Sequence, residues 1–477
     1  RGTYAGAVTM ARRDLPPGPP LPPALQAALM WQFWPRYTSA CRRLYGSPFT
    51  LRVATMGTIV YTDDLAEIKK VFAGDPATYH AGEANSMLRG MLGSSSILVI
   101  DDELHRERRR SMLAPFHRDA VARQADAIAQ IAAANIATWP VGTTFPVAPR
   151  MSEITLEVIL RTVVGASDPV RLAALRRIMP KLLNLTPFAL LAISNPDLQR
   201  KRLWRSVRRN IADADRLLYA EIADRRRDPD LDSRHDALSM LIRAEAQREN
   251  RMTDNELRDQ LMTLLVAGHD TTATGLSWAL ERLTRHPGIL AKAVQAAVAS
   301  AAGDPSGDEY LDAVAKETLR VRPVVFDVGR VLTKPVDLAG YRLPAGVMVA
   351  PAVGLVHSTR ALYPEPHEFD PSRMHGDAFV PASWMPFGGG VRRCLGAAFA
   401  MTEMRIVLRE VLLRTELATT DRRGERQKVK HVILVPGKGG LIRVSRVKSS
   451  APQRILPTTD SVPSPTPEGC CPSDTSR

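Results

Sequence analysis

One cysteine stands in a setting that could make it a reactive anion or a metal ligand. Cys394 follows the run Phe387-Gly-Gly-Gly-Val-Arg-Arg and precedes residues 395–412, which have helical periodicity. The unpaired amides and the positive dipole end at the start of such a helix favour a thiolate over a thiol. An isolated cysteine before a helix is more often buried and unreactive, so the surrounding pattern has to decide between the two.

The pattern around this cysteine is specific. Residues 387–396 have the form F-x-x-G-x-R-x-C-x-G, and five specified residues in ten coincide in fewer than about one in a million windows at average amino-acid usage. The form resembles the haem-binding signature of the cytochromes P450, in which a cysteine thiolate is the axial iron ligand and favours O–O cleavage. The resemblance implies haem b (iron protoporphyrin IX) as the cofactor and Cys394 as its metal ligand.

The resemblance also implies roles for the neighbours of Cys394. Phe387 is expected to pack beside the thiolate and limit water, and Arg392 to pair with a haem propionate. Gly390 and Gly396 are expected to let the backbone approach the porphyrin where a Cβ would clash.

A second match lies about 125 residues earlier, within a long segment of helical periodicity. Ala267-Gly-His-Asp-Thr-Thr resembles the A-G-x-D-T-T segment over the distal haem face. The resemblance implies that Ala267 and Gly268 leave a gap for dioxygen. Asp270 and Thr271 are the expected catalytic pair: the hydroxyl hydrogen-bonds the oxygen and the carboxylate relays protons from solvent. For His269 we expect packing rather than proton delivery. Taken alone, hydroxyls in a helix usually bond back to a carbonyl one turn earlier.

A third match is structural. Glu317 and Arg320 can share a helix face, and the family's F-x-P-x-R element matches Phe369-Asp-Pro-Ser-Arg373. Arg373 is therefore expected to complete a Glu–Arg–Arg triad that holds the loop of the cysteine.

The remaining matches concern the haem propionates. His105 and Arg109, spaced i, i+4, can lie on one helix face, and the matching pair in soluble bacterial P450s binds propionates. Arg330 is expected to bind the remaining propionate. For isolated residues the alternatives are a solvated charged helix and an ordinary arginine at a strand edge.

The elements that must position these residues are mainly helical. Helical periodicity is clearest near residues 21–45, 64–73, 103–115, 119–138, 151–164, 169–184, 201–226, 235–247, 254–285, 287–302, 308–321 and 395–412. Short strands are expected near 49–53 and 58–61, a hairpin at 337–349, and an irregular stretch at 358–393.

The fold class expected is mainly α: the cytochrome P450 fold, a large helical domain with a few small β-sheets around a buried haem. The resemblance covers about residues 16–445. The expected organisation is a Pro-rich lead-in at 1–20, a single catalytic domain at 21–445 and a disordered tail at 446–477, where Ser, Thr and Pro dominate.

Composition indicates the cellular compartment and limits the classes of partner to be expected. The net charge is +14, which suits nucleic acid, an acidic membrane surface or an acidic protein. Because the arginines are scattered and only 5% of residues are aromatic, nucleic-acid binding is disfavoured. The four cysteines (Cys41, Cys394, Cys470 and Cys471) form no disulfide pattern, which favours a cytoplasmic location. No apolar run is long enough for a transmembrane segment; peripheral membrane association is left open.

The reaction implied by the resemblance is monooxygenation: one atom of O2 enters the substrate and the other leaves as water. No flavin or iron–sulfur segment is fused to the P450 region, so electrons are expected from a ferredoxin and a ferredoxin reductase. Arginines on one predicted helix and near the cysteine should form a basic docking face for the ferredoxin: Arg106, Arg108, Arg110, Arg393, Arg405 and Arg409.

The expected substrate is a lipophilic small molecule. The pocket is expected to be lined by residues 80–100, 178–193, 263–271 and 323–328, which are mostly aliphatic, with Phe188 and Phe326 as aromatic candidates. For Asp327 a hydrogen-bonded turn is favoured over a substrate contact. Fatty acids, sterols, terpenoids and polyketides all stay open. The alternative functions are a peroxide-driven or non-oxygenating haem-thiolate enzyme on the same fold, and a haem sensor.

Overall fold

The computed structural model describes residues 15–166, 168–183, 189, 202–246, 251–376 and 379–448. Phe188, Cys470, Cys471 and most of the tail predicted at 446–477 lie outside the described residues. The start of that tail was placed too early, because Val447 still belongs to a strand. Within the described ranges, no helix is long and apolar enough to cross a bilayer.

Helices form most of the described chain. The longer ones are α1 (Pro23–Tyr45), α2 (Leu65–Ala73), α5 (Asp102–Met112), α7 (Ala125–Ile136), α8 (Ala148–Ile159), α9 (Pro169–Leu183), α12 (Arg205–Arg226), α13 (Ala237–Ala246), α14 (Asp254–Leu283), α15 (Pro287–Ala301), α16 (Pro305–Val321) and α18 (Ala397–Arg414). The short ones are α3 (Ala81–Ala84), α4 (Arg89–Leu92), α6 (Arg118–Ala122) and α17 (Val353–Val356). The predicted helices are therefore present, although the one predicted at 119–138 is divided into α6 and α7.

The strands form small sheets. One sheet has the order β1 (Phe49–Val53), β2 (Gly57–Thr62), β8 (Met348–Pro351), β5 (Arg330–Leu332) and β3 (Tyr79–His80). The others are β6 (Val336–Leu338) with β7 (Tyr341–Leu343), β10 (Gln427–Lys430) with β11 (Ile433–Pro436), and β4 (Thr144–Pro146) with β12 (Leu441–Val447) and β9 (Thr415–Leu417). In the first sheet β2 and β8 are parallel and the other pairs are antiparallel. The fold is mainly α with small sheets, as predicted.

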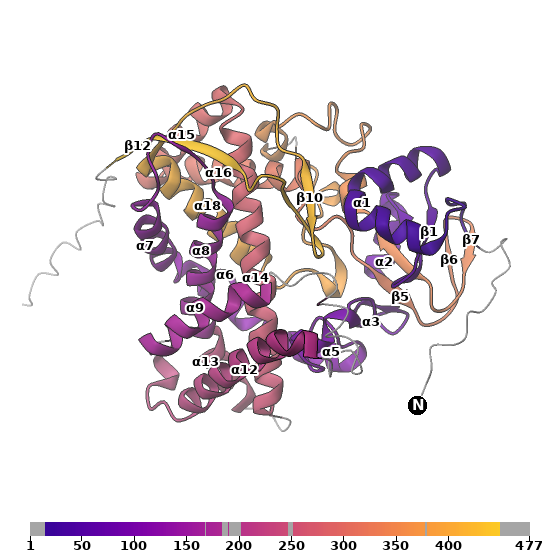
Figure 1. Cartoon of the computed structure of the whole chain (residues 1–477), viewed down its shortest axis with the longest axis horizontal. Coiled ribbons are helices and arrows are strands. Elements are labelled where there is room, and N and C mark those ends of the chain that lie inside the picture. The colour runs from indigo at the N-terminus through magenta and orange to yellow at the C-terminus, as the bar shows by residue number, and fades with distance from the viewer. Residues whose placement is uncertain are drawn as a thin grey trace, which may run out of the picture.

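The helix α14 organises the helical part. It is 30 residues long, which corresponds to about 45 Å. A capping box at its start joins the Thr253 hydroxyl to the Glu256 amide and the Glu256 carboxylate to the Thr253 amide. The helix packs against α8, α12, α16 and α18. Figure 1 shows it running through the helical part, with α1, β1, β6 and β7 on the other side of the molecule.

Two apolar clusters meet this helix at its two ends. One involves α7, α8, α15, α16, α18 and the second half of α14, from Ala273 to Leu283. The other involves α8, α9, α12, α13 and the first half of α14, from Leu257 to Leu265. The stretch at 267–272, which carries the A-G-x-D-T-T match, belongs to neither cluster. On this stretch Ala267 is exposed, whereas His269 and Thr272 are buried, so only one side of the middle of the helix is free of packing.

Candidate active site

The cysteine lies in a tight loop that precedes α18. The Cys394 amide donates a hydrogen bond to the carbonyl of Phe387, at 3.0 Å, and the Arg393 amide donates to the carbonyl of Gly390, also at 3.0 Å. The helix begins at Ala397, two residues later than predicted. The loop thereby fixes the direction of the cysteine side chain at the helix start.

Two opposing influences act on the sulfur. Burial raises the pKa of the Cys394 thiol above its ordinary value, and the Gly396 amide, which hydrogen-bonds the sulfur, and the charges of Arg109 and Arg393 oppose this rise only in part. The side chain is nevertheless exposed. Leu395, next in the chain, packs against the apolar cluster of the first half of α14. An accessible sulfur with an amide donor and cations beside it is suited to binding a metal as a thiolate.

A cluster of cationic side chains, formed by Arg109, Arg330 and Arg392 with the neutral His105 beside them, lies near the cysteine. His105 on α5 is only 2% exposed, and its Nδ1 has no hydrogen-bond partner among the described residues. Burial and the charges of Arg392, Arg109 and Arg330 lower the pKa of His105 to about 3. Burial likewise lowers the pKa of Arg330 and of Arg392 to about 10; the charge of Arg392 adds to the lowering at Arg330, and that of Arg109 to the lowering at Arg392. The site therefore concentrates positive charge in a poorly solvated place.

Two of the three cations in this cluster have no counter-ion among the described residues. Arg392 pairs with Asp101, at 2.5 Å. Arg109 donates to the carbonyl of Arg393, at 2.7 Å, and Arg330 to that of Gly329, at 2.8 Å. Within the described part of the chain, no carboxylate forms an ion pair with Arg109 or Arg330. Buried cations without anions are costly, so the arrangement calls for an anionic ligand.

The middle of α14 presents an accessible window. Ala267 is exposed and Asp270 and Thr271 are partly so, whereas Leu265 and Thr272 on either side are buried. The Thr271 hydroxyl donates to the carbonyl of Ala267, at 2.7 Å. This is the ordinary bond of a hydroxyl in a helix, and the side chain still borders open space.

Two other residues of this motif, Gly268 and His269, pack against α8. Gly268 was expected to leave a gap for dioxygen, but a Cβ there would lie 2.3 Å from Cδ1 of Ile159. The glycine is therefore required by the close contact with α8. His269 is 2% exposed, and its Nε2 lies 2.9 Å from the hydroxyl of Ser152 on α8. Its side chain packs between helices, in line with the favoured interpretation.

Lys430 is a residue that the sequence did not reveal. Its Nζ donates to both oxygens of Asp270, at 3.1 and 2.9 Å, from the end of β10. The two residues are 160 positions apart, and a lone lysine in a short strand gives no local pattern. Only the pairing of β10 with β11 beside α14 brings it to the site.

The glycines of the cysteine loop differ in purpose. Gly390 has φ +65°, and a Cβ there would lie 1.9 Å from the carbonyl oxygen of Phe72. The contact that requires this glycine is therefore with the C-terminal end of α2, and the expectation that it faces the porphyrin is wrong. A Cβ on Gly396 would meet no protein atom within 4 Å, so this glycine borders space that another group can fill.

The Glu–Arg pair is fully buried, but its third member differs from the prediction. Glu317 and Arg320 have 0% exposed side chains and make two hydrogen bonds of 2.7 and 2.8 Å. Burial raises the pKa of Glu317, which Arg320 and the charge of Arg373 oppose. The guanidinium of Arg373, however, lies 4.0 Å from Asp370. The remaining bond to Glu317 comes from the Asp370 amide, at 3.0 Å.

Two side chains that were expected to be accessible, one on a docking face and one in the substrate pocket, are buried. Arg108, expected on a docking face, is only 6% exposed and forms an ion pair with Glu256 at the start of α14. Phe326, expected in the substrate pocket, is 4% exposed and packs on Trp34, with ring centroids 5.9 Å apart.

The next residue, Asp327, forms a hydrogen bond with Tyr61. Burial raises the pKa of Asp327 to about 7, and this hydrogen bond opposes the rise.

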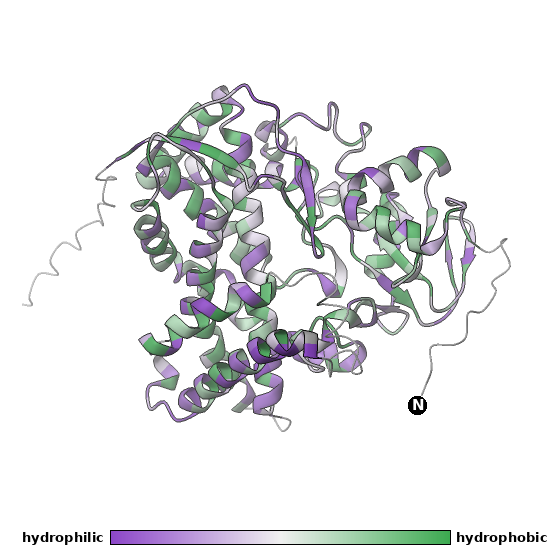
Figure 2. Ribbon diagram, viewed as in Figure 1, coloured by the Kyte–Doolittle hydropathy of each residue, from purple (hydrophilic) through white to green (hydrophobic). Residues whose placement is uncertain are grey.

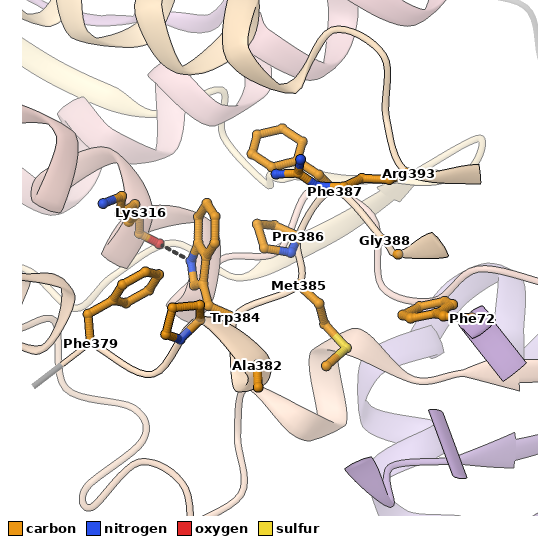
Figure 3. A pocket seen from close by; sticks show the side chains of 12 residues that line it. Phe72, Lys316, Phe379, Ala382, Trp384, Met385, Pro386, Phe387, Gly388 and Arg393 are labelled. Atoms are coloured by element: carbon orange, nitrogen blue, oxygen red, sulfur yellow. Dashed lines mark hydrogen bonds between the residues drawn. The ribbon is translucent and has the colours of Figure 1, made fainter. Parts of the chain in front are cut away.

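A separate open pocket of about 370 Å³ lies beside the cysteine loop (Figure 3). Phe72, Trp384, Phe387 and Arg393 are among the residues that line it. The Phe387 ring stacks edge-on against Trp384, at 5.8 Å, and the Trp384 indole donates to the carbonyl of Lys316. Phe387 is thus held by aromatic packing next to the loop that bears the cysteine.

The side chains fit a haem on three independent counts. An accessible cysteine can supply the thiolate ligand. In the cationic cluster beside His105, Arg392 has a carboxylate partner, whereas Arg109 and Arg330 lack the anions that two propionates would provide. Gly396 and the exposed Ala267 border space that protein atoms do not fill. A mainly helical fold with such a site defines a haem-thiolate protein.

Comparison with known proteins agrees with this class. The sequence profile of the family "Cytochrome P450" matches residues 16–444. The chain belongs to the cytochrome P450 family, whose members are haem-thiolate monooxygenases in general.

Individual relatives support the family assignment, and the names of the two mycobacterial relatives state no substrate. The chain is 68% identical over 430 residues to cytochrome P450 135B1 of Mycobacterium tuberculosis, covering 90% of this chain and 91% of the relative. It is 40% identical to cytochrome P450 135A1 of the same species, covering 93% and 96%. The solved structure titled "Retinoic acid bound cyanobacterial CYP120A1" aligns with a TM-score of 0.78 and 24% identity, covering 90% of this chain and 99% of that one. The likeness to this solved structure shows a shared fold.

Proposed function

We propose that the protein inserts one oxygen atom from O2 into a lipophilic small molecule, with electrons from a ferredoxin and a ferredoxin reductase. The observation that carries the proposal is the accessible middle of α14. There an acid and a hydroxyl, Asp270 and Thr271, adjoin the exposed Ala267, between the buried stretches 257–263 and 272–283 of the helix. A proton-delivering pair is what dioxygen chemistry requires and what a haem sensor does not.

The residues that would hold the haem follow from the site. Cys394 would ligate the iron, and His105, Arg109, Arg330 and Arg392 would bind the two propionates. When bound, the haem supplies the activation of dioxygen. Binding also removes the electrostatic cost of the cationic cluster, because the propionates provide the anions that it lacks.

Other residues would shape the two faces of the haem. Ala267, with a single methyl group, leaves room over the distal face, and Gly396 leaves room on the side of the cysteine. Phe387, packed against Trp384, would limit the access of water to the sulfur. An apolar wall beside the sulfur restricts its contact with water and with dissolved oxidants.

The acid and the hydroxyl would move protons. Asp270 is partly accessible and is fixed by two hydrogen bonds from Lys430, so its carboxylate can exchange protons with solvent at a defined position. The Thr271 hydroxyl now donates to the carbonyl of Ala267. A rotation about χ1 would turn this donor toward the distal space, where it can donate a proton and be resupplied by Asp270.

The substrate would be held largely by apolar contacts. Leu264 and Val266, which flank the window of α14, are partly accessible and aliphatic. A lipophilic small molecule matches such a lining. The chemical class of the substrate stays open within that description.

The ferredoxin would dock where the surface is basic next to the cysteine. Arg393 is exposed, and on α5 the side chains of Arg106 and Arg110 are 49% and 65% exposed, although both pair with Glu103. Arg405 and Arg409 contribute less, because they are partly covered and pair with Asp312 and Glu410. An acidic partner would be attracted over a long range to such a face. A cytoplasmic location, where ferredoxins are reduced, is part of the proposal.

The test is product formation from a library of lipophilic compounds with NADPH, ferredoxin, ferredoxin reductase and 18O2. We expect a product that carries one 18O atom and depends on every component. Product formed with hydrogen peroxide alone, and not with the electron-transfer proteins, would replace the proposal with a peroxide-driven enzyme. A product without the label would indicate a non-oxygenating enzyme.

A further inference from the structure

The open pocket beside the cysteine loop has the size of a ligand site. Its volume is about 370 Å³, which falls in the range of small-molecule sites. It is called here the aromatic pocket, because the rings of Phe72, Phe379, Trp384 and Phe387 are part of its lining. Figure 3 shows Phe379 and Phe72 at opposite ends of the pocket, with Trp384 between them.

Contacts within the fold hold these rings in place. The Trp384 ring stands edge-on to that of Phe379, with ring centroids 5.9 Å apart. Its indole N–H donates to the carbonyl of Lys316, at 3.0 Å. At the other end, a Cβ on Gly389 would lie 2.3 Å from Cδ2 of Phe72, so this ring lies directly against the backbone. Because the walls are already ordered, a ligand would bind without the entropic cost of ordering them.

The described lining holds two cations and no carboxylate. The cations are Lys316 on α16 and Arg393 in the cysteine loop, and neither forms an ion pair with another described residue. The Lys316 Nζ lies 4.8 Å from the centroid of the Phe379 ring, which places the charge at the pocket wall. Asp312, one turn before Lys316, pairs instead with Arg405, at 2.9 Å. The pocket therefore has a positive potential that the side chains of its lining do not neutralise.

The rest of the wall is apolar. Residues 384–389 carry no charged side chain, and the indole N–H of Trp384 is already used within the fold. Along the outer helices, by contrast, hydrophobic and hydrophilic residues alternate (Figure 2). An occupant of the aromatic pocket has to present an apolar body to the rings and an anion to the cations.

We propose that the aromatic pocket binds a small aromatic carboxylate. The rings of this ligand would pack edge-on or offset-stacked against Trp384 and Phe72. Its carboxylate would accept charge-assisted hydrogen bonds from Lys316 and Arg393. Within the described part of the chain, no residue of α14 lines the pocket, so this ligand site is distinct from the substrate site over that helix.

Other occupants fit less well. A neutral apolar molecule would leave both cations without a counter-ion. An inorganic anion would use the cations but would leave the four rings in water. A side chain of a docked ferredoxin offers one of the two groups at a time, since an acidic side chain lacks the aromatic body and an aromatic side chain lacks the anion.

The experiment is titration calorimetry of the haem-loaded full chain with naphthalene-2-carboxylate. An excess of 4-phenylimidazole is present throughout, so that the iron and the space over α14 are occupied. We expect the carboxylate to bind at one site per chain. The neutral naphthalene-2-carboxamide, of the same shape, should bind at least about tenfold more weakly, because it lacks the charge that strengthens the hydrogen bonds.

Three variants locate the site. Lys316→Gln should weaken binding of the carboxylate at least about tenfold and leave that of the carboxamide unchanged; Lys316 is preferred to Arg393, which also acts on the pKa of Cys394. Ala382→Trp should abolish binding, because Ala382 is exposed and lines the pocket, so that the larger ring can fill it. The matched control is Lys292→Gln, which removes an exposed lysine of α15 and should leave binding unchanged. The absorption spectrum of the haem verifies that each variant is folded.

Several results would overturn the proposal. One is the absence of binding, and another is binding that neither Lys316→Gln nor Ala382→Trp weakens. Equal affinities for the carboxylate and the carboxamide would reject an anion site. Binding that occurs only without 4-phenylimidazole would place the carboxylate in the substrate site. If the carboxylate does not bind while Ala382→Trp weakens the binding of ferredoxin, the pocket belongs to the protein partner.

Discussion

The buried ion pair of Glu317 and Arg320 provides a sharp test of how the cysteine loop is held. Both side chains are 0% exposed. Arg320 uses its remaining donors on the carbonyls of His357, Pro366 and Glu368, at 2.9, 2.7 and 3.0 Å. The guanidinium thus joins α16 to the irregular segment that leads to the cysteine loop.

The perturbation is Glu317→Gln. One oxygen acceptor is kept, but an amide NH2 group now faces the N–H donors of Arg320, and the guanidinium loses its paired carboxylate. Breaking a buried pair on one side leaves an uncompensated charge and costs about 3–5 kcal/mol. We therefore expect the free energy of unfolding to fall by about this amount, with part of the haem released or bound without the thiolate.

The assay is urea unfolding of the haem-loaded protein, followed by far-UV circular dichroism and by haem absorbance. Glu103→Gln is the matched control, because Glu103 also pairs with arginines but its side chain is 65% exposed; there the loss should be less than about 1 kcal/mol. If Glu317→Gln costs no more than the control does, the pair does not stabilise this part of the fold and the reasoning fails.

Three further predictions concern α14 and its surroundings. Gly268→Ala should lower the free energy of unfolding by about 1–3 kcal/mol. Adding Ile159→Val, which deletes the carbon that lies 2.3 Å from the new Cβ, should restore most of this loss. If urea unfolding shows no recovery in the double variant, the contact does not explain the glycine. Burial raises the pKa of Asp327 from 3.8 to about 7, so the folded chain keeps a proton that the unfolded chain releases, and stability should fall as pH rises from about 4 to 7. Asp327→Asn should remove that part of the slope in unfolding measured against pH; an unchanged slope would assign it to other groups. Thr271→Ala should increase the NADPH consumed per product formed, whereas Thr272→Ala, whose hydroxyl is buried against the Gly268 carbonyl, should not; equal ratios would remove the proposed role of Thr271.

Much of the site could be predicted because its residues are close together in the sequence or belong to regular elements. Cys394 and Gly396 stand in one ten-residue motif, and Asp270 and Thr271 occupy one turn of a long helix. The resemblance of these two motifs to those of the family therefore identified them as candidates. The helix α14 was predicted almost to its ends, because Thr253 and Glu256 form a capping box that is legible in the sequence.

What could not be predicted depends on contacts between distant segments. Lys430 reaches Asp270 across 160 positions, and no local pattern marks a lysine as the partner of a given carboxylate. Arg108 looked like a surface residue in a charged helix, yet Glu256 draws it into the interior. Gly268 and Gly390 were placed toward the haem, but each is required by a neighbour, Ile159 and the carbonyl of Phe72. Only the packed structure distinguishes a glycine required by a ligand from one required by another helix.

The central claim is that the Cys394 sulfur binds a haem iron as a thiolate. The most direct measurement is the absorption difference spectrum of the reduced, carbon-monoxide-bound protein, recorded for the wild type and for Cys394→Ala, with Cys41→Ala as the control for loss of a buried thiol. The account predicts the red-shifted Soret band of thiolate-ligated haem in the wild type and in Cys41→Ala, and its loss in Cys394→Ala. A purified protein without haem, or an identical red-shifted band in all three proteins, would contradict it.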